Sequence, residues 1–139
     1  MNNEIKELMN LFVKFINTAD ENLAKKLVSS KAVFFAPTSP EPLKGPEGYM
    51  IVLGMMRGGF SDIQWTLEET VIEDNRVATR FTLNGTHNGI FMGIPASGKR
   101  ISVQATNFYE FEEQQIVKEY GMPDLLSLLI QIGALPQLG

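Results

Sequence analysis

The side chain best suited to acid–base chemistry is Glu119, which lies in an expected strand from Ile116 to Met122. If that strand turns Glu119 toward an apolar interior, desolvation raises the pKa of its carboxyl and suits it to take an acidic proton from carbon. The alternative is an exposed strand glutamate paired with Lys118 or Arg100, which is the commoner arrangement for this residue type. The spacing within this strand alone does not choose between the two.

Asn107 is the one fully polar side chain on the apolar face of a second expected strand, Ile101 to Phe111. A buried amide without partners costs roughly 1–3 kcal/mol. Either a neighbouring protein group or a ligand must therefore satisfy Asn107, and both alternatives stay open.

The turn between these two strands decides which residue faces Asn107. A two-residue hairpin turn at Glu113-Gln114 places Tyr120 opposite Asn107, whereas a three-residue loop with a bulge places Glu119 there. The two registers predict opposite orientations for Glu119, because side chains alternate between the faces of a strand.

His87 is the only histidine, and the sequence contains no cysteine. Zinc sites draw their three or four ligands mainly from these two residue types, so we expect no metal, and no cofactor is indicated. Because His87 lies between Gly85 and Gly89, a loop residue bonded to backbone carbonyls is one interpretation, and assistance to a catalytic glutamate is the other.

Composition and charge indicate one soluble domain over residues 1–139. The length suffices for one hydrophobic core, and with 44% hydrophobic and 20% charged residues the chain resembles neither a disordered segment nor a membrane span. A net charge of −4 without a Lys/Arg block gives little support for nucleic-acid binding. The absence of cysteine and the charged, helix-patterned first residues favour the cytoplasm.

Helical spacing of apolar residues predicts three helices near the start of the chain and a short one near its end. The first covers residues 5–16. The second begins at a capping box of Thr18 and Glu21 and ends near Ser29. The third runs from Pro46 to a stop at Gly58-Gly59. The last lies near residues 125–132, with Asp124 as its expected cap.

After residue 63 the apolar period changes from near four to two, which predicts strands near residues 63–71, 77–83, 101–112 and 116–122. A short strand at residues 32–36 precedes a proline-rich loop. Helices followed by an antiparallel meander indicate an α+β fold with the helices on one face of a curved sheet. Such a cone-like sheet, closed by helices, leaves a hollow.

Two segments resemble the SnoaL-like polyketide cyclase family. The stretch Gly85 to Arg100 reads GTHNGIFMGIPASGKR, which is similar to the family's Gly-Thr-His-x-Gly and Gly-Ile-Pro pattern. The stretch Ile116 to Gly133 is similar to the family's closing strand and final helix. The resemblance implies the α+β cone of nuclear transport factor two, usually dimeric, with a small apolar or aromatic molecule held in the cone.

The sequence departs from this family at the residues that do its chemistry. The family's cyclases use an aspartate on the last strand as general acid/base for an aldol closure, and the matching position is Gly121; a cavity histidine matches Asn107. A glycine can neither take nor deliver a proton, so we expect that aldol activity to be absent or very slow. The inward position at Gly121 favours the three-residue register, with Glu119 facing Asn107 and Gly121 facing Ala105.

The resemblance and the residues together give three hypotheses for function. In the first, Glu119 assisted by Asn107 or His87 catalyses a cyclase, isomerase or dehydratase reaction. The second is a ligand carrier without catalysis, which Gly121 favours, and the third is a protein-interaction module. The expected ligand-binding residues, which could equally fill the core, are Trp65, Phe81, Tyr109, Met50 and Met92.

A two-fold dimer through the outer face of the sheet is the first testable expectation. It rests on the resemblance and on Phe108, an aromatic residue among the outward-facing Gln104, Thr106 and Glu110. Light scattering at micromolar protein should give twice the 15.5 kDa mass of one chain. The monomer mass would contradict it.

Overall fold

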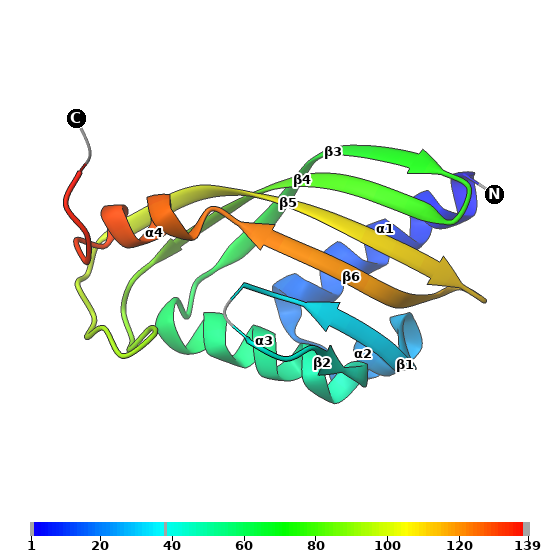
Figure 1. Cartoon of the computed structure of the whole chain (residues 1–139), viewed down its shortest axis with the longest axis horizontal. Coiled ribbons are helices and arrows are strands. Elements are labelled where there is room, and N and C mark those ends of the chain that lie inside the picture. Colours follow the sequence, from blue (N-terminus) through cyan, green and yellow to red (C-terminus); the bar gives the residue numbers. More distant parts are fainter. Residues whose placement is uncertain (1, 38, 138–139) are drawn as a thin grey trace.

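The computed structural model describes residues 2–37 and 39–137, which form an α+β fold with a curved sheet (Figure 1). In chain order the elements are α1 (Asn2–Thr18), α2 (Glu21–Leu27), β1 (Val28–Phe35), β2 (Leu43–Lys44), α3 (Gly45–Gly59), β3 (Gln64–Glu73), β4 (Arg76–Thr86), β5 (Arg100–Glu112), β6 (Gln115–Pro123) and α4 (Leu125–Gln131). Among the described helices, none has both the length and the apolar character that a membrane crossing requires.

The six strands form one sheet in the order β2-β1-β6-β5-β4-β3. Strands β3 to β6 pair antiparallel in succession, which confirms the predicted meander. Strand β1 lies parallel to β6, and the short β2 pairs with β1; neither pairing was predicted. Helices α1, α2 and α3 cover one face of the sheet, and α4 follows β6 at one end of it (Figure 1). The predicted fold class is confirmed.

The start of α2 differs from the sequence prediction. Asp20 caps this helix, because its Oδ1 accepts from the backbone N–H groups of Asn22 at 2.8 Å and Leu23 at 3.3 Å. The Thr18 hydroxyl instead donates to the Lys14 carbonyl at 2.8 Å, inside α1. The predicted capping box is therefore wrong: α1 continues through Thr18, and the carboxylate two residues later takes the cap. At the other end of the chain, Asp124 accepts from the Ser127 N–H at 3.0 Å and caps α4 as predicted.

Aromatic rings fill the space between the helices and the sheet. Phe12 of α1 packs edge-on against Tyr109 of β5 at 5.2 Å between ring centroids and against Tyr49 of α3 at 5.5 Å. Phe34 of β1 also packs edge-on against Tyr49, at 4.8 Å between ring centroids. Burying each such side chain contributes about 1.5–3 kcal/mol. The same packing fixes where the two tyrosine hydroxyls point.

Asn17, near the end of α1, joins that helix to the edge strand β3. Its Nδ2 donates to the Trp65 carbonyl at 3.0 Å, and its Oδ1 accepts from the Trp65 N–H at 2.7 Å. One carboxamide therefore satisfies both backbone groups of a single residue, which holds the main chain of Trp65 in one place.

The loop from His87 to Lys99 is fastened to the end of α3. The backbone N–H groups of Asn88 and Gly89 both donate to the Gly59 carbonyl at 3.1 Å. Gly89 approaches the helix so closely that a Cβ on it would overlap the carbonyl oxygen of Gly58. Only glycine fits at this position without moving the loop or the helix.

Gly89→Ala should therefore lower the free energy of unfolding by about 1–3 kcal/mol, the usual cost of forcing an extra group into a packed site. Gly54→Ala is the matched control, because a Cβ there meets nothing within 4 Å in the middle of α3. That change should raise stability by up to about 1 kcal/mol. Urea unfolding of both variants measures the difference, and equal stability for the two would contradict the close approach.

Candidate functional site

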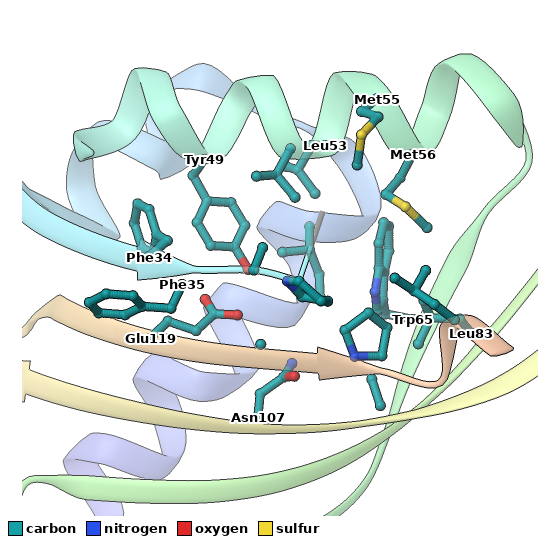
Figure 2. Close-up of a pocket in the computed structure, with 18 of the residues that line it drawn as sticks. Phe34, Phe35, Tyr49, Leu53, Met55, Met56, Trp65, Leu83, Asn107 and Glu119 are labelled. Carbon is teal, nitrogen blue, oxygen red and sulfur yellow. The ribbon is translucent and has the colours of Figure 1, made fainter. Parts of the chain in front are cut away.

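A largely apolar cavity lies between α3 and the concave face of the sheet (Figure 2). Its free volume is ≈ 100 Å³. Helices α1 and α3, strands β1 and β3 to β6, and the first residue of α4 contribute lining side chains. The apolar part of the wall includes Phe34, Leu53, Met56, Leu83, Phe91 and Leu125.

Glu119 lies in this cavity and is 7% exposed. Figure 2 shows its carboxyl on β6, near the hydroxyl of Tyr49. Its Oε1 atom has no hydrogen-bond partner among the described residues. Burial raises the pKa of the Glu119 carboxyl from its ordinary 4.5 to about 8, and hydrogen bonding with Tyr49 opposes only part of that rise. The prediction that β6 turns this glutamate inward is confirmed.

Two buried tyrosines face the Glu119 carboxyl. Tyr49 comes from α3, and Tyr109 lies directly opposite Glu119 in the β5–β6 ladder. Burial holds the pKa of each phenol well above its usual value, and the charge of the Glu119 carboxylate adds to the rise. Both hydroxyls therefore keep their protons and remain donors over the physiological range.

Tyr49 lies inside the helix predicted from Pro46 to Gly58-Gly59, but the sequence did not identify it as a site residue. Its signal in the sequence is weak, because a tyrosine at an apolar helical position is usually core. The informative feature is the hydroxyl, since a buried tyrosine normally directs it to a polar partner.

Asn107 is half-buried in the cavity wall, and protein groups satisfy its amide. Its Nδ2 donates to the Tyr109 Oη at 3.1 Å, and its Oδ1 accepts from the Met122 N–H at 3.1 Å. The core-amide interpretation of Asn107 is therefore the one that the structure supports. Because the amide supplies a donor to Tyr109 Oη, the phenol proton of Tyr109 is left to point elsewhere.

Neither of the two expected registers forms between β5 and β6. Asn107 lies opposite Gly121, and Tyr109 lies opposite Glu119. The prediction that Glu119 faces Asn107, with Gly121 facing Ala105, is wrong; Ala105 lies opposite Pro123.

The hairpin combines features of both alternatives. A two-residue turn is present at Glu113-Gln114, with φ of 49° and 67°. Val117 then forms a bulge in β6, because Phe111 pairs with Ile116 while Glu110 pairs with Lys118. This extra residue in β6 shifts the ladder by one residue from the two-residue register. The Glu119 side chain thus still points into the cavity, but Glu119 lies two residues before Gly121, the residue that pairs with Asn107.

Gly121 lies between Glu119 and Asn107. A Cβ on this glycine would be 3.4 Å from Glu119 Oε2 and 3.7 Å from Asn107 Oδ1. The carboxyl of Glu119 therefore occupies space next to the position from which a side chain at residue 121 would project.

The other expected ligand-binding residues divide into two groups. Trp65 and Tyr109 line the cavity. Phe81 is fully buried in the core away from the lining, Met50 packs half-buried beside Tyr49, and Met92 is 51% exposed on the loop after β4. The inward face of α3 instead carries Tyr49, Leu53 and Met56, because these residues are spaced by four and three. Met55 joins them in the lining.

His87 lies outside the cavity lining and is fully buried. Its Nδ1 accepts from the Ser97 N–H at 3.1 Å and is 2.8 Å from the Ser97 hydroxyl. Its Nε2 has no partner among the described residues, and the ring packs 5.4 Å from that of Phe60. His87 stabilises the 87–99 loop through its bonds with Ser97, and it does not line the cavity that contains Glu119.

Within residues 2–37 and 39–137, no group of three histidine, cysteine, aspartate or glutamate side chains is arranged to hold a metal ion. The acid–base groups of the cavity are Glu119, Tyr49 and Tyr109. The arrangement provides one carboxyl of raised pKa and two hydroxyl donors at one end of an apolar chamber.

Comparison with known proteins agrees with the fold described above. The family model of the SnoaL-like polyketide cyclases matches residues 6–132. Aklanonic acid methyl ester cyclase DnrD of Streptomyces peucetius is 31% identical over 97 residues, which make up 68% of this chain and 66% of that protein. The similar cyclase DauD of Streptomyces sp. strain C5 is matched over 59% of its length. The chain thus spans less than two thirds of the length of these curated relatives.

Two solved structures share the fold closely. TsrD from Streptomyces laurentii superposes with a TM-score of 0.86 at 27% identity, over 97% of this chain and 98% of that one. A putative SnoaL-like polyketide cyclase from Jannaschia sp. CCS1 gives 0.86 at 18% identity, over 96% and 94% of the two chains. At 18% identity, the similarity to the Jannaschia protein shows a shared fold only.

The raised pKa of Glu119 predicts how stability changes with pH. Between pH 4.5 and about 8 the native state keeps a proton that the unfolded state loses, so the free energy of unfolding falls as the pH rises. The slope approaches about 1.4 kcal/mol per pH unit for this one group. Glu119→Gln removes the titrating group and should flatten that part of the slope.

Urea unfolding at several pH values measures this effect. Glu119→Gln should match the wild type near pH 5 and exceed it in stability above pH 8. Glu112→Gln, at an exposed position of β5, is the control and should follow the wild type at every pH. A wild-type slope unchanged by Glu119→Gln would contradict the buried, protonated carboxyl.

Proposed function

The chain belongs to the SnoaL-like polyketide cyclase family, and we propose that it is an acid–base enzyme in which Glu119 moves a proton on carbon next to a carbonyl group. The substrate is a compact apolar molecule held in the cavity. The reaction class is that of the cyclases, isomerases or dehydratases that begin with such a proton transfer.

The observation that carries this proposal is the unpartnered Oε1 of Glu119 in an otherwise apolar cavity. A buried carboxyl oxygen without a partner costs stability, and an apolar side chain would avoid that cost. Its pKa of about 8 lies close to physiological pH, where a group can both take and return a proton. A purely structural role gives no reason for either property.

The two tyrosines supply the second part of the chemistry. When a base removes a proton next to a carbonyl, the electron pair moves to the carbonyl oxygen, and donors aimed at that oxygen stabilise the enolate. Tyr49 and Tyr109 are protonated donors beside Glu119. Asn107 donates to Tyr109 Oη, which orients this phenol and leaves its own proton available to the substrate.

We do not propose the reaction named for DnrD, because the resemblance matches the family's catalytic aspartate with Gly121, which has no side chain to carry a proton. The carboxyl of Glu119 lies beside that position, and a Cβ at residue 121 would be 3.4 Å from its Oε2. We therefore place the acid–base function on Glu119, whose carboxyl approaches the same region of the cavity from a neighbouring inward position.

A ligand carrier is the second candidate function. Gly121 favours it, because the cavity remains while the family's acid is gone. A carrier would bind the same class of molecule without exchange of its protons, so turnover separates the two functions.

The proposed assembly is a homodimer through the outer face of the sheet. Phe108 and Met122 are each 61% exposed there, and Phe35 stacks on Tyr120 at 4.7 Å between ring centroids. This apolar group of side chains supports a self-complementary contact.

Exchange of the methyl protons of acetophenone in heavy water tests the enzymatic proposal, because the ketone has one ring and acidic protons next to its carbonyl. The wild type should catalyse exchange, with a rate that rises with pH until about 8 as Glu119 ionises. Glu119→Gln should lower the rate by about 10²–10⁴-fold.

Glu112→Gln serves again as the exposed control, and proton NMR follows the loss of the methyl signal. Undiminished exchange by Glu119→Gln would refute Glu119 as the acid–base group. Binding of acetophenone without any exchange by the wild type would identify the carrier instead.

A further inference from the structure

We infer that the cavity accepts carbonyl compounds with a single ring and excludes fused ring systems, and that Trp65, positioned by Asn17, sets this limit. The inference names the substrate class of the site described above and rests on the function proposed for it.

The free volume of the cavity is small. It amounts to ≈ 100 Å³, whereas an engineered apolar cavity that binds benzene measures about 150 Å³, and sites for drug-sized ligands measure roughly 300–1,000 Å³. One ring nearly fills such a space. A fused system that placed its carbonyl beside Glu119 would have to displace part of the wall.

Trp65 forms the wall away from the polar end. In the view of Figure 2 the indole stands beside Leu83 and Met56, while Glu119 and Tyr49 lie toward the other end of the labelled set. All five side chains line the cavity. A molecule that fits must therefore direct its oxygen toward Glu119 and end its apolar body at the indole.

Asn17 keeps this wall in place. Trp65 lies on β3, the edge strand, so its outward backbone groups have no further strand to pair with. The Asn17 carboxamide satisfies both of them, at 2.7 Å and 3.0 Å. The main chain of Trp65 is held on one side by β4 and on the other by α1, so the Cα from which the indole projects is kept at the edge of the cavity.

The polar end of the cavity selects the functional group. Glu119 Oε1 has no partner among the described residues, the Tyr49 hydroxyl bonds with the Glu119 carboxyl, and Tyr109 lies opposite Glu119 in the β5–β6 ladder. A carbonyl oxygen accepts from these groups, whereas a hydrocarbon of the same size would leave them unsatisfied. The ligand class is therefore a ring-sized apolar ketone or its enol.

Acetophenone and 2-acetonaphthone form a matched pair of probes, since they carry the same methyl ketone on one ring and on two fused rings. In an ordinary apolar site the larger ketone binds more tightly, because it buries more apolar surface. Isothermal titration calorimetry of the wild type should show the reverse order, with acetophenone tighter by about tenfold or more. Trp65 is the only tryptophan, so its fluorescence should also report acetophenone entering the cavity.

Trp65→Leu should restore the ordinary order, with 2-acetonaphthone the tighter ligand. Asn17→Ala should reduce the preference for acetophenone several-fold, because it removes the two bonds that hold the main chain of Trp65. Asn10→Ala, at an exposed position of the same helix, is the control and should leave the ratio of the two affinities unchanged. Circular dichroism checks that each variant is folded. The ratio of the two affinities is the readout, because a general loss of stability would weaken both ligands alike.

Wild-type binding of 2-acetonaphthone as tight as that of acetophenone would overturn the inference, and so would the absence of acetophenone binding at millimolar concentration. A selectivity that Trp65→Leu leaves unchanged would show that another side chain sets the limit. Selective binding without proton exchange would refute the proposed enzymatic function and leave the size limit standing.

Discussion

The burial of the Glu119 carboxyl is the constraint on which the rest of the site depends. An ionised carboxylate in an apolar cavity would cost several kcal/mol without compensation, and the protein meets this cost by letting the group keep its proton to about pH 8. Tyr49 reaches Glu119 from α3, and Tyr109 stands opposite it on β5. The aromatic packing around Phe12 fixes both phenols. The packing of α1 and α3 against the sheet therefore positions the groups that surround the Glu119 carboxyl and influence its pKa.

The hairpin between β5 and β6 decides which face carries the acid. Side chains alternate along a strand, so a shift of one residue would send Tyr120 inward and Glu119 to solvent. The bulge at Val117 sets the observed register. It also places Gly121 opposite Asn107, where the absence of a side chain leaves room beside the Glu119 carboxyl. The carboxyl of Glu119 can therefore occupy the space beside residue 121, although Glu119 itself lies two residues earlier in β6.

Local periodicity predicted the helices and the four-stranded meander, because each follows from residues close in sequence. The inward direction of Glu119 did not follow from that periodicity; it was implied by the family resemblance, through the inward position that Gly121 matches. The parallel pairing of β1 with β6 and the bulge at Val117 depend on contacts between distant segments, and no local pattern contains them. Tyr49 was missed for the same reason, since its role is defined by Glu119, seventy positions away. Met92 does not line the cavity, and residue type alone does not reveal that the loop after β4 turns it to solvent.

The central claim is that one glutamate in this chain remains protonated at neutral pH inside the cavity. Carbon-13 NMR of protein labelled at the glutamate side-chain carboxyl carbons measures this directly, because each carboxyl shifts as it ionises. We expect one resonance with a midpoint near pH 8 that disappears in Glu119→Gln. A Glu119 resonance that titrates near the ordinary value of 4.5 would contradict it.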